Sequence, residues 1–302
     1  MTAFPVMAAD GRIDGLEQTG AGTTTVTVSW KQPKEAVQYE IYSSLSGKES
    51  YSLKKSVSSR SLRVTTTVTV SSKAVSGYYD LRIAAFDEDG RRVAEEELKR
   101  CVTVPGKVTG ITQKSLYTSR QMKFGWRRQA TAAGYEVETY QYSSKEKRVI
   151  KVRSVYGTIP MRQDELYRIR IRGYVQLKTG GRTKTYYGTY GTVYTSLQPR
   201  LTFEGADEHS AIVNWKPVNG ADSYAVFISR SQKSGYKRVE ITQAPTAVLE
   251  NLKPNTRYYV MVRVNKRVKG ILYRSPSTYV YPFRIDTKGS AGNTEAGFVL
   301  ET

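Results

Sequence analysis

The residues best placed to bind another molecule are three arginines at every second position, Arg168, Arg170 and Arg172. The positions next to them are apolar: Tyr167, Ile169 and Ile171. Successive side chains of a β-strand point to opposite faces, so we expect the arginines in one outward row. A nearby hairpin adds three cations: Lys178, Arg182 and Lys184. Such groups bind phosphate or carboxylate, so these residues predict a surface for an anionic polymer.

A second interpretation of the arginine row is structural. Glu136 and Glu138 lie on the strand expected beside it, and cross-strand ion pairs of this kind contribute about 0.2–1 kcal/mol each. The row would then be a solvated face that also discourages edge-to-edge aggregation. Two glutamates cannot offset three arginines and the nearby lysines, so we expect a net positive face under either interpretation.

The charge of the chain is concentrated around this row. The 302 residues include 47 Lys and Arg against 27 Asp and Glu, a formal net charge of +20. Residues 105–197 hold 18 basic and 5 acidic residues, whereas residues 1–104 hold 14 and 13, and residues 198–302 hold 15 and 9. A basic balance favours an anionic partner, and self-repulsion favours a monomer.

The sequence offers little support for a metal site, a disulfide bond or a catalytic site. One His and one Cys exclude a multi-histidine metal centre and an intramolecular disulfide. His209 lies in a polar turn, and the positive charge of Lys99 and Arg100 would lower the pKa of Cys101 without supplying a partner base. The acidic segment 87–90 is a hairpin-turn signal with too few oxygen ligands for calcium. We therefore expect no metal, no cofactor and no catalytic site.

The strand segments that would position these residues recur along the sequence as a repeat. The three tryptophans, Trp30, Trp126 and Trp215, are 96 and 89 residues apart, and each ends a stretch of alternating apolar residues. A Tyr follows each Trp after nine residues: Tyr39, Tyr135 and Tyr224. A fixed period of this length indicates three units of one fold. Alternation without a sustained helical period predicts an all-β chain of tandem β-sandwiches.

The landmarks resemble those of fibronectin type III domains, which are immunoglobulin-like sandwiches. The clearest stretch is Leu252-Lys-Pro-Asn-Thr-Arg-Tyr258, which is similar to the tyrosine corner of that family. The stretches 105–111, 133–137 and 178–188 resemble repeats of secreted, clostridia-like Gram-positive proteins. The first unit departs at residues 74–79, where the corner lacks its Leu and Pro. The resemblance implies that Trp30, Trp126, Trp215 and Tyr258 are core residues.

Five segments follow from these boundaries. Residues 1–9 are either the remnant of a signal peptide or a short lead without structure. The three sandwiches are expected at residues 10–104, 105–197 and 198–286. Residues 287–302 are rich in Gly, Ser, Asn and Thr, which is typical of a flexible tail or linker.

The resemblance and the charge together predict a non-catalytic extracellular or cell-surface protein. It would act as a spacer or adhesion scaffold and bind an anionic wall polymer or an acidic glycan through its basic middle sandwich. An alternative is an accessory region of a secreted carbohydrate-active enzyme, and a further one is recognition of another surface protein. No motif for sequence-specific nucleic-acid binding and no transmembrane run is present.

Overall fold

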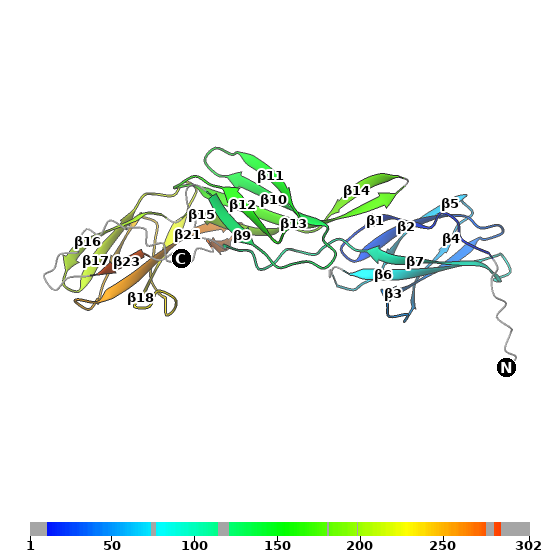
Figure 1. Ribbon diagram of the computed structural model, residues 1–302, viewed down its shortest axis with the longest axis horizontal. Helices are drawn as coiled ribbons and strands as arrows, with labels where there is room; N and C mark the ends of the chain where they lie inside the picture. The colour runs from blue at the N-terminus through cyan, green and yellow to red at the C-terminus, as the bar shows by residue number, and fades with distance from the viewer. Residues whose placement is uncertain are drawn as a thin grey trace. The chain divides into compact units, whose positions relative to one another are not determined.

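The computed structural model describes residues 11–73, 77–113, 121–179, 181–197, 199–275 and 281–284. The expected signal-peptide remnant at residues 1–9 and the tail at residues 287–302 lie outside this part of the chain. All the secondary-structure elements in the described part of the chain are β-strands (Figure 1). The strands form six sheets, which pair into three sandwiches in tandem. The all-β fold expected from the alternation is confirmed.

The first sandwich pairs a three-stranded sheet with a four-stranded one. The smaller sheet has the order β1-β2-β5, with β1 at Glu17–Ala21, β2 at Thr25–Lys31 and β5 at Arg63–Thr69. The larger has the order β4-β3-β6-β7, with β3 at Gln38–Leu45, β4 at Ser52–Ser58, β6 at Tyr78–Phe86 and β7 at Arg92–Val102. Their inner faces share one apolar core around Trp30, which is fully buried.

The second sandwich follows the same plan. Its smaller sheet has the order β12-β9-β8, with β8 at Thr112–Gln113, β9 at Gln121–Gly125 and β12 at Tyr156–Pro160. The larger sheet has the order β11-β10-β13-β14, and β15 also pairs with β13. These strands are β10 at Gly134–Gln141, β11 at Lys147–Val152, β13 at Leu166–Thr179, β14 at Arg182–Tyr187 and β15 at Gly191–Ser196.

The third sandwich repeats the plan again. Its smaller sheet has the order β16-β17-β20, with β16 at Leu201–Asp207, β17 at Ser210–Trp215 and β20 at Thr246–Leu249. The larger has the order β19-β18-β21-β22, and β23 also pairs with β21. These strands are β18 at Ser223–Ser229, β19 at Lys237–Thr242, β21 at Arg257–Val268, β22 at Ile271–Arg274 and β23 at Tyr281–Arg284.

The Trp-to-Tyr spacing produces the same contact at both ends of the chain. The rings of Trp30 and Tyr39 meet edge to face with centroids 5.2 Å apart, and Trp215 and Tyr224 repeat this at 5.2 Å. Each Trp lies at or next to the end of a strand of the smaller sheet, and each Tyr is the second residue of the following strand, which belongs to the larger sheet. The pair therefore joins the two sheets through the core, and edge-to-face ring pairs add stability beyond their buried area.

The chain divides into two compact units that do not coincide with the sandwiches. One unit contains residues 1–109, 127–136 and 172–190, and the other contains 110–126, 137–171 and 191–302. The division passes through β10 and β13. Each unit therefore includes one junction between successive sandwiches.

The junction in the first unit is formed by the β13–β14 hairpin. Val175 and Leu177 of β13 pack with Val102 and Val104, and Tyr186 of β14 donates a hydrogen bond to the carbonyl of Thr19. The loop after Trp126 adds side-chain hydrogen bonds to residues 103–106, which connect the first two sandwiches. The Thr131 hydroxyl donates to the Thr103 carbonyl at 3.2 Å and the Gln129 amide donates to the Gly106 carbonyl at 2.8 Å.

The junction in the second unit uses the corresponding loop and hairpin of the third sandwich. The backbone of Asn219 bonds to that of Asp164 and Leu166, and its side chain donates to Glu165 at 3.0 Å. Tyr273 of β22 packs its ring against Tyr194 with centroids 4.7 Å apart. Leu166 is 1% exposed because it lies in the core cluster of the third sandwich. Apolar and polar contacts therefore couple these two sandwiches.

The tyrosine corner gives a first testable prediction. The hydroxyl of Tyr258, whose residue is 7% exposed, accepts the backbone N–H of Lys253 at 2.8 Å. Replacing Tyr258 by Phe removes this acceptor and leaves the N–H unpaired, which costs about 1–3 kcal/mol. We expect this loss in a urea unfolding transition of the third sandwich. Tyr259→Phe is the control, because that ring lies on the opposite face of β21, and an equal loss there would contradict the prediction.

Candidate functional site: the basic surface of the second sandwich

β13 presents its residues as the alternation predicts. Ile169 and Ile171 are fully buried and Tyr167 is 5% exposed, so the arginines lie on the outer face of the sheet. The Tyr167 hydroxyl accepts the backbone N–H of Arg162 at 2.9 Å, which holds the chain where it enters the strand. Strand pairing places β10, with its two glutamates, directly beside β13.

Glu138 collects three cations in the second compact unit. Arg170 binds it through two bonds, from Nε to Oε1 at 2.8 Å and from Nη2 to Oε2 at 2.7 Å. Arg168 reaches Oε1 at 3.3 Å, and Lys147 of β11 reaches Oε2 at 3.0 Å. The carboxylate is 2% exposed beneath these side chains. Burial alone would raise the pKa of Glu138, but the bonds from Arg170 and Lys147 outweigh it and lower the pKa to about 2.

Arg172 belongs to a separate cluster in the first compact unit. Its Nε donates to Glu136 Oε1 at 2.9 Å, and Nη2 lies 2.7 Å from the same oxygen. The guanidinium lies over the rings of Tyr187 and Tyr190, 4.0 Å and 4.4 Å from their centroids. The hydroxyl of Tyr190 also donates to Glu136. This arginine is therefore held by one carboxylate and by two aromatic rings.

The two clusters show how deeply the glutamates are covered. Glu136 and Glu138 face the arginine row, as the cross-strand interpretation expects, and they are 7% and 1% exposed because the arginine side chains cover them. The arginine side chains themselves are 25–32% exposed. The geometry shows the cross-strand pairing of the structural interpretation, and polymer binding by the row stays a prediction.

The hairpin cations differ from the arginine row in exposure. Lys178, Arg182 and Lys184 are all exposed. Within the described residues, no hydrogen bond or ion pair involves the side chain of Lys178 or Arg182, and the ammonium group of Lys184 lies 5.1 Å from the ring centroid of Tyr186. The hairpin therefore presents cations whose charge is not neutralised by neighbouring carboxylates.

Two further cations were missed by the sequence reasoning. Arg127 and Arg128 are exposed in the loop after Trp126, and the next residue, Gln129, contacts the chain where the hairpin begins at Gly173. The signal was present as a pair of adjacent arginines after a strand. Without the tertiary contact between Gln129 and Gly173, however, nothing connected this loop with the hairpin.

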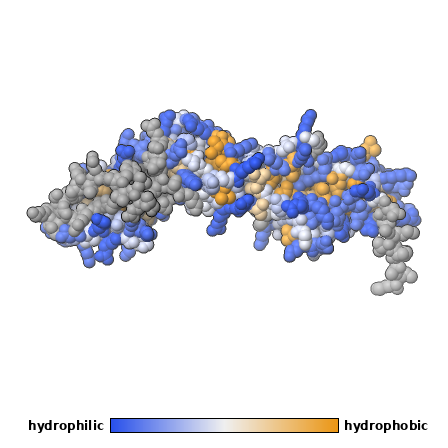
Figure 2. Space-filling view, viewed as in Figure 1, coloured by the Kyte–Doolittle hydropathy of each residue, from blue (hydrophilic) through white to orange (hydrophobic). Residues whose placement is uncertain are grey.

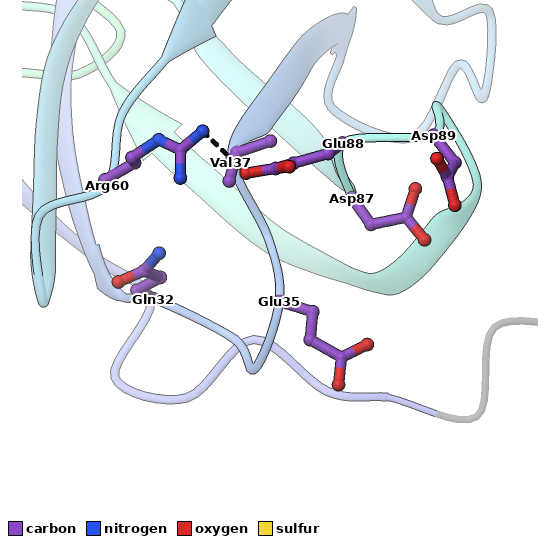
Figure 3. A pocket seen from close by; sticks show the side chains of 7 residues that line it. All are labelled: Gln32, Glu35, Val37, Arg60, Asp87, Glu88 and Asp89. Atoms are coloured by element: carbon purple, nitrogen blue, oxygen red, sulfur yellow. Dashed lines mark ion pairs between the residues drawn. The ribbon is translucent and has the colours of Figure 1, made fainter.

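The acidic turn of the first sandwich forms a hollow of about 440 Å³ (Figure 3). Its carboxylates are largely engaged: Glu88 pairs with Arg60 at 2.6 Å, Asp89 with Arg91 at 3.2 Å, and Asp87 accepts the backbone N–H of Arg91. As the sequence predicts, residues 87–90 form the hairpin turn between β6 and β7. In the described part of the chain, no group of three His, Cys, Asp or Glu residues could hold a metal ion.

The pKa of Cys101 differs from the expectation. The thiol is buried, and burial raises its pKa to about 12 instead of lowering it. The side chains of Lys99 and Arg100 do not offset this because both lie at the surface of the strand end, whereas Cys101 belongs to the core of the first sandwich. A thiol with so high a pKa is inert at neutral pH.

Comparison with known proteins agrees with this architecture. The family model of the fibronectin type III domain matches residues 197–280. The matched residues span the third sandwich, which is therefore similar to a fibronectin type III domain. The first and second sandwiches repeat its sheet orders, so the chain is a tandem array of fibronectin type III-like sandwiches. Domains of this type are commonly non-catalytic modules of extracellular proteins.

Among solved structures, the chain is similar to the crystal structure of the FN1–FN3 domains of chicken CNTN1. The match covers 91% of this chain and 98% of that chain at 16% identity, with a TM-score of 0.27. The search of curated proteins gave no match. Within the described residues, no helix has the length and apolar character needed to span a membrane.

Proposed function

We propose that this chain is a non-catalytic extracellular scaffold whose second sandwich binds an anionic polymer, such as an acidic glycan or a phosphate-containing wall polymer. The fibronectin type III match supports the scaffold role. The observation that carries the binding role is the exposure of the hairpin cations Lys178, Arg182 and Lys184, in contrast to the paired arginine row.

The coupled junctions support a spacer role. In each compact unit, a hairpin of one sandwich packs against the sandwich before it, through Tyr186 in one unit and Tyr273 in the other. Such contacts restrict the motion of a sandwich relative to its neighbour in the same unit. Within each unit, a binding surface would therefore keep its orientation relative to the neighbouring sandwich.

Charge reversal on the hairpin tests the binding role. The variant Lys178→Glu, Arg182→Glu, Lys184→Glu is expected to elute from heparin–agarose at clearly lower salt than the unchanged protein, since contacts of exposed charges are screened by salt. The control reverses three exposed lysines of the first sandwich, Lys31, Lys48 and Lys54, and so changes the net charge equally. Equal shifts in the two variants would mean that only net charge matters and would refute a hairpin site.

The arginine row is a poor target for the same test. Replacing Arg168, Arg170 and Arg172 by Ser would leave Glu136 and Glu138 buried without their cations, and an unpaired buried charge is strongly destabilising. Loss of binding in that variant would combine local unfolding with loss of contacts. The hairpin variant avoids this because its cations are exposed.

A further inference from the structure

Exposed apolar side chains gather on one edge of every sandwich. Eleven large hydrophobic residues are exposed in the described part of the chain. Eight of them lie on an edge strand of the larger sheet (β4, β11 or β19), on the next strand in the sequence, which is an edge strand of the smaller sheet (β5, β12 or β20), or in the turn between the two. They are Leu53 and Leu62 in the first sandwich, Val149, Ile150 and Tyr156 in the second, and Val239, Ile241 and Val248 in the third. The described surface on the face seen in Figure 2 is mostly hydrophilic, with a few hydrophobic patches. Single apolar side chains scattered over a surface are normal, whereas apolar side chains that recur at the same edge of each sandwich indicate a contact surface.

This edge also carries unpaired backbone. β4, β11 and β19 each stand at the end of their sheet, so one side of each strand has no neighbouring strand among the described residues. Such a row of N–H and C=O groups is a template for another strand. Bulges interrupt two of these edges, because neither Lys54 in β4 nor Val239 in β19 has a partner opposite it. Bulges twist an edge away from further pairing.

β11 combines the unpaired edge with positive charge. Its six residues include Lys147, Arg148 and Lys151 and no acidic residue. Lys147 and Arg148 pair with Glu138 and Glu146, yet their side chains remain 56% and 61% exposed. Val149 and Ile150 between these cations are 47% and 40% exposed. The edge therefore offers main-chain bonds, aliphatic contacts and cations together.

A second apolar group extends this surface. Tyr156 at the start of β12 is 49% exposed, and the ammonium group of Lys123 lies 4.2 Å from the centroid of its ring. Both residues belong to the same compact unit as β11. The cation over the ring adds another positive charge next to apolar surface.

We propose that β11 binds an extended acidic segment of a partner protein, which adds to the sheet as a further strand. Main-chain bonds to the free edge would supply affinity, and alternate side chains would supply specificity. Carboxylates of the segment would face the cations of β11, and aliphatic side chains would contact Val149 on one face and Ile150 on the other. This site goes beyond the proposed polymer-binding role, because that role uses the hairpin in the other compact unit.

The test uses the full chain and a defined probe, a fluorescein-labelled peptide of repeated Glu-Glu-Val-Val with blocked ends, which presents both carboxylates and aliphatic side chains on each face of an extended strand. Binding is measured by fluorescence anisotropy. A second peptide with the same side chains carries N-methyl groups at alternate residues, which removes the N–H groups of one edge. We expect the methylated peptide to bind about tenfold more weakly or worse, because several main-chain bonds are lost.

A pair of matched variants locates the site. Val149→Asp places a carboxylate at the centre of β11 and should weaken binding of the unmethylated peptide at least as much as methylation does. Val239→Asp introduces the same change at a residue of almost equal exposure, 48%, on the bulged edge of the third sandwich, and should leave binding unchanged.

Three results would overturn the proposal. The methylated and unmethylated peptides could bind equally, which would mean attraction of side chains alone. The two Asp variants could weaken binding equally, which would mean no preference for β11. The hairpin charge reversal could abolish peptide binding while Val149→Asp does not, which would place the acidic peptide on the polymer surface.

Discussion

Glu138→Gln is expected to lower the free energy of unfolding of the second sandwich by about 3 kcal/mol, because it leaves cations over a buried site without their counter-charge. Arg170 loses both bonds to a carboxylate, and Arg168 and Lys147 lose their partner. Native-state hydrogen exchange of the amides in β10 and β13 measures this change in the region concerned, without assuming that the whole chain unfolds in one step.

The matched control for this variant is Glu146→Gln. Glu146 also pairs with an arginine, Arg148 at 2.7 Å, but its side chain is 42% exposed. Exposed pairs contribute about 0–1 kcal/mol, so exchange in the same strands should hardly change. Equal effects of the two substitutions would show that burial of Glu138 does not matter and would contradict the assignment.

The same carboxylate predicts a pH dependence. Its folded pKa of about 2 lies below the ordinary value of 4.5, so the stability it contributes is fully present above pH 4.5. That stability is lost as the pH falls from about 4.5 to about 2, and by linkage it amounts to about 3 kcal/mol. Glu138→Gln should flatten the pH dependence of exchange in this interval. A variant that keeps the full acid sensitivity of the unchanged protein would show that other groups cause it.

Gly188→Ala is expected to disrupt the junction in the first compact unit. The N–H of Gly188 bonds to the carbonyl of Gly173 at 2.8 Å, and a Cβ at this position would lie 2.0 Å from the carbonyl oxygen of Pro105. A backbone carbonyl cannot move aside as a flexible side chain can. We therefore expect the free energy of unfolding to fall by about 3 kcal/mol, in the upper part of the range for overpacked cores. Faster proteolysis within residues 173–188 and faster amide exchange in β14 would report release of the hairpin.

Gly47→Ala provides the comparison. No atom lies within 4 Å of the position of its Cβ, but its φ of 79° disfavours any residue with a side chain. The expected cost is about 1 kcal/mol and confined to the first sandwich. If Gly188→Ala costs no more than this and leaves the hairpin protected, the close approach to Pro105 does not hold the junction.

Much of the fold could be predicted from spacing alone. Trp30 and Tyr39, and Trp215 and Tyr224, are nine residues apart in the chain and meet in the same edge-to-face geometry. The reason is local: a short loop between two strands of opposite sheets leaves one relative position for the two rings. The alternation at residues 167–172 likewise determined which side chains of β13 are buried.

The hydroxyl of the Tyr that follows each Trp after nine residues has a partner that the spacing alone could not predict. Tyr135 and Tyr224 accept the backbone N–H of the residue six positions earlier, at 2.9 Å from Gln129 and 2.8 Å from Val218. In the first sandwich that position is Pro33, which has no N–H to donate. Burial accordingly raises the pKa of Tyr39. The difference is visible in the sequence, but its meaning depends on knowing which loop lies over which ring.

The pairing and burial of the charged side chains in the candidate site depend on the tertiary structure. Spacing, alternation and composition were enough to predict three sandwiches of one fold, an outward arginine row and the concentration of charge in the middle sandwich. It could not determine that Glu138 is buried under Arg168, Arg170 and Lys147, or that Arg172 lies over two tyrosines. Those contacts join residues 9 to 32 positions apart in the chain, and only strand pairing and rotamer choice bring them together. The hairpin cations remain exposed for the converse reason, since no carboxylate of the described residues lies close enough to pair with them.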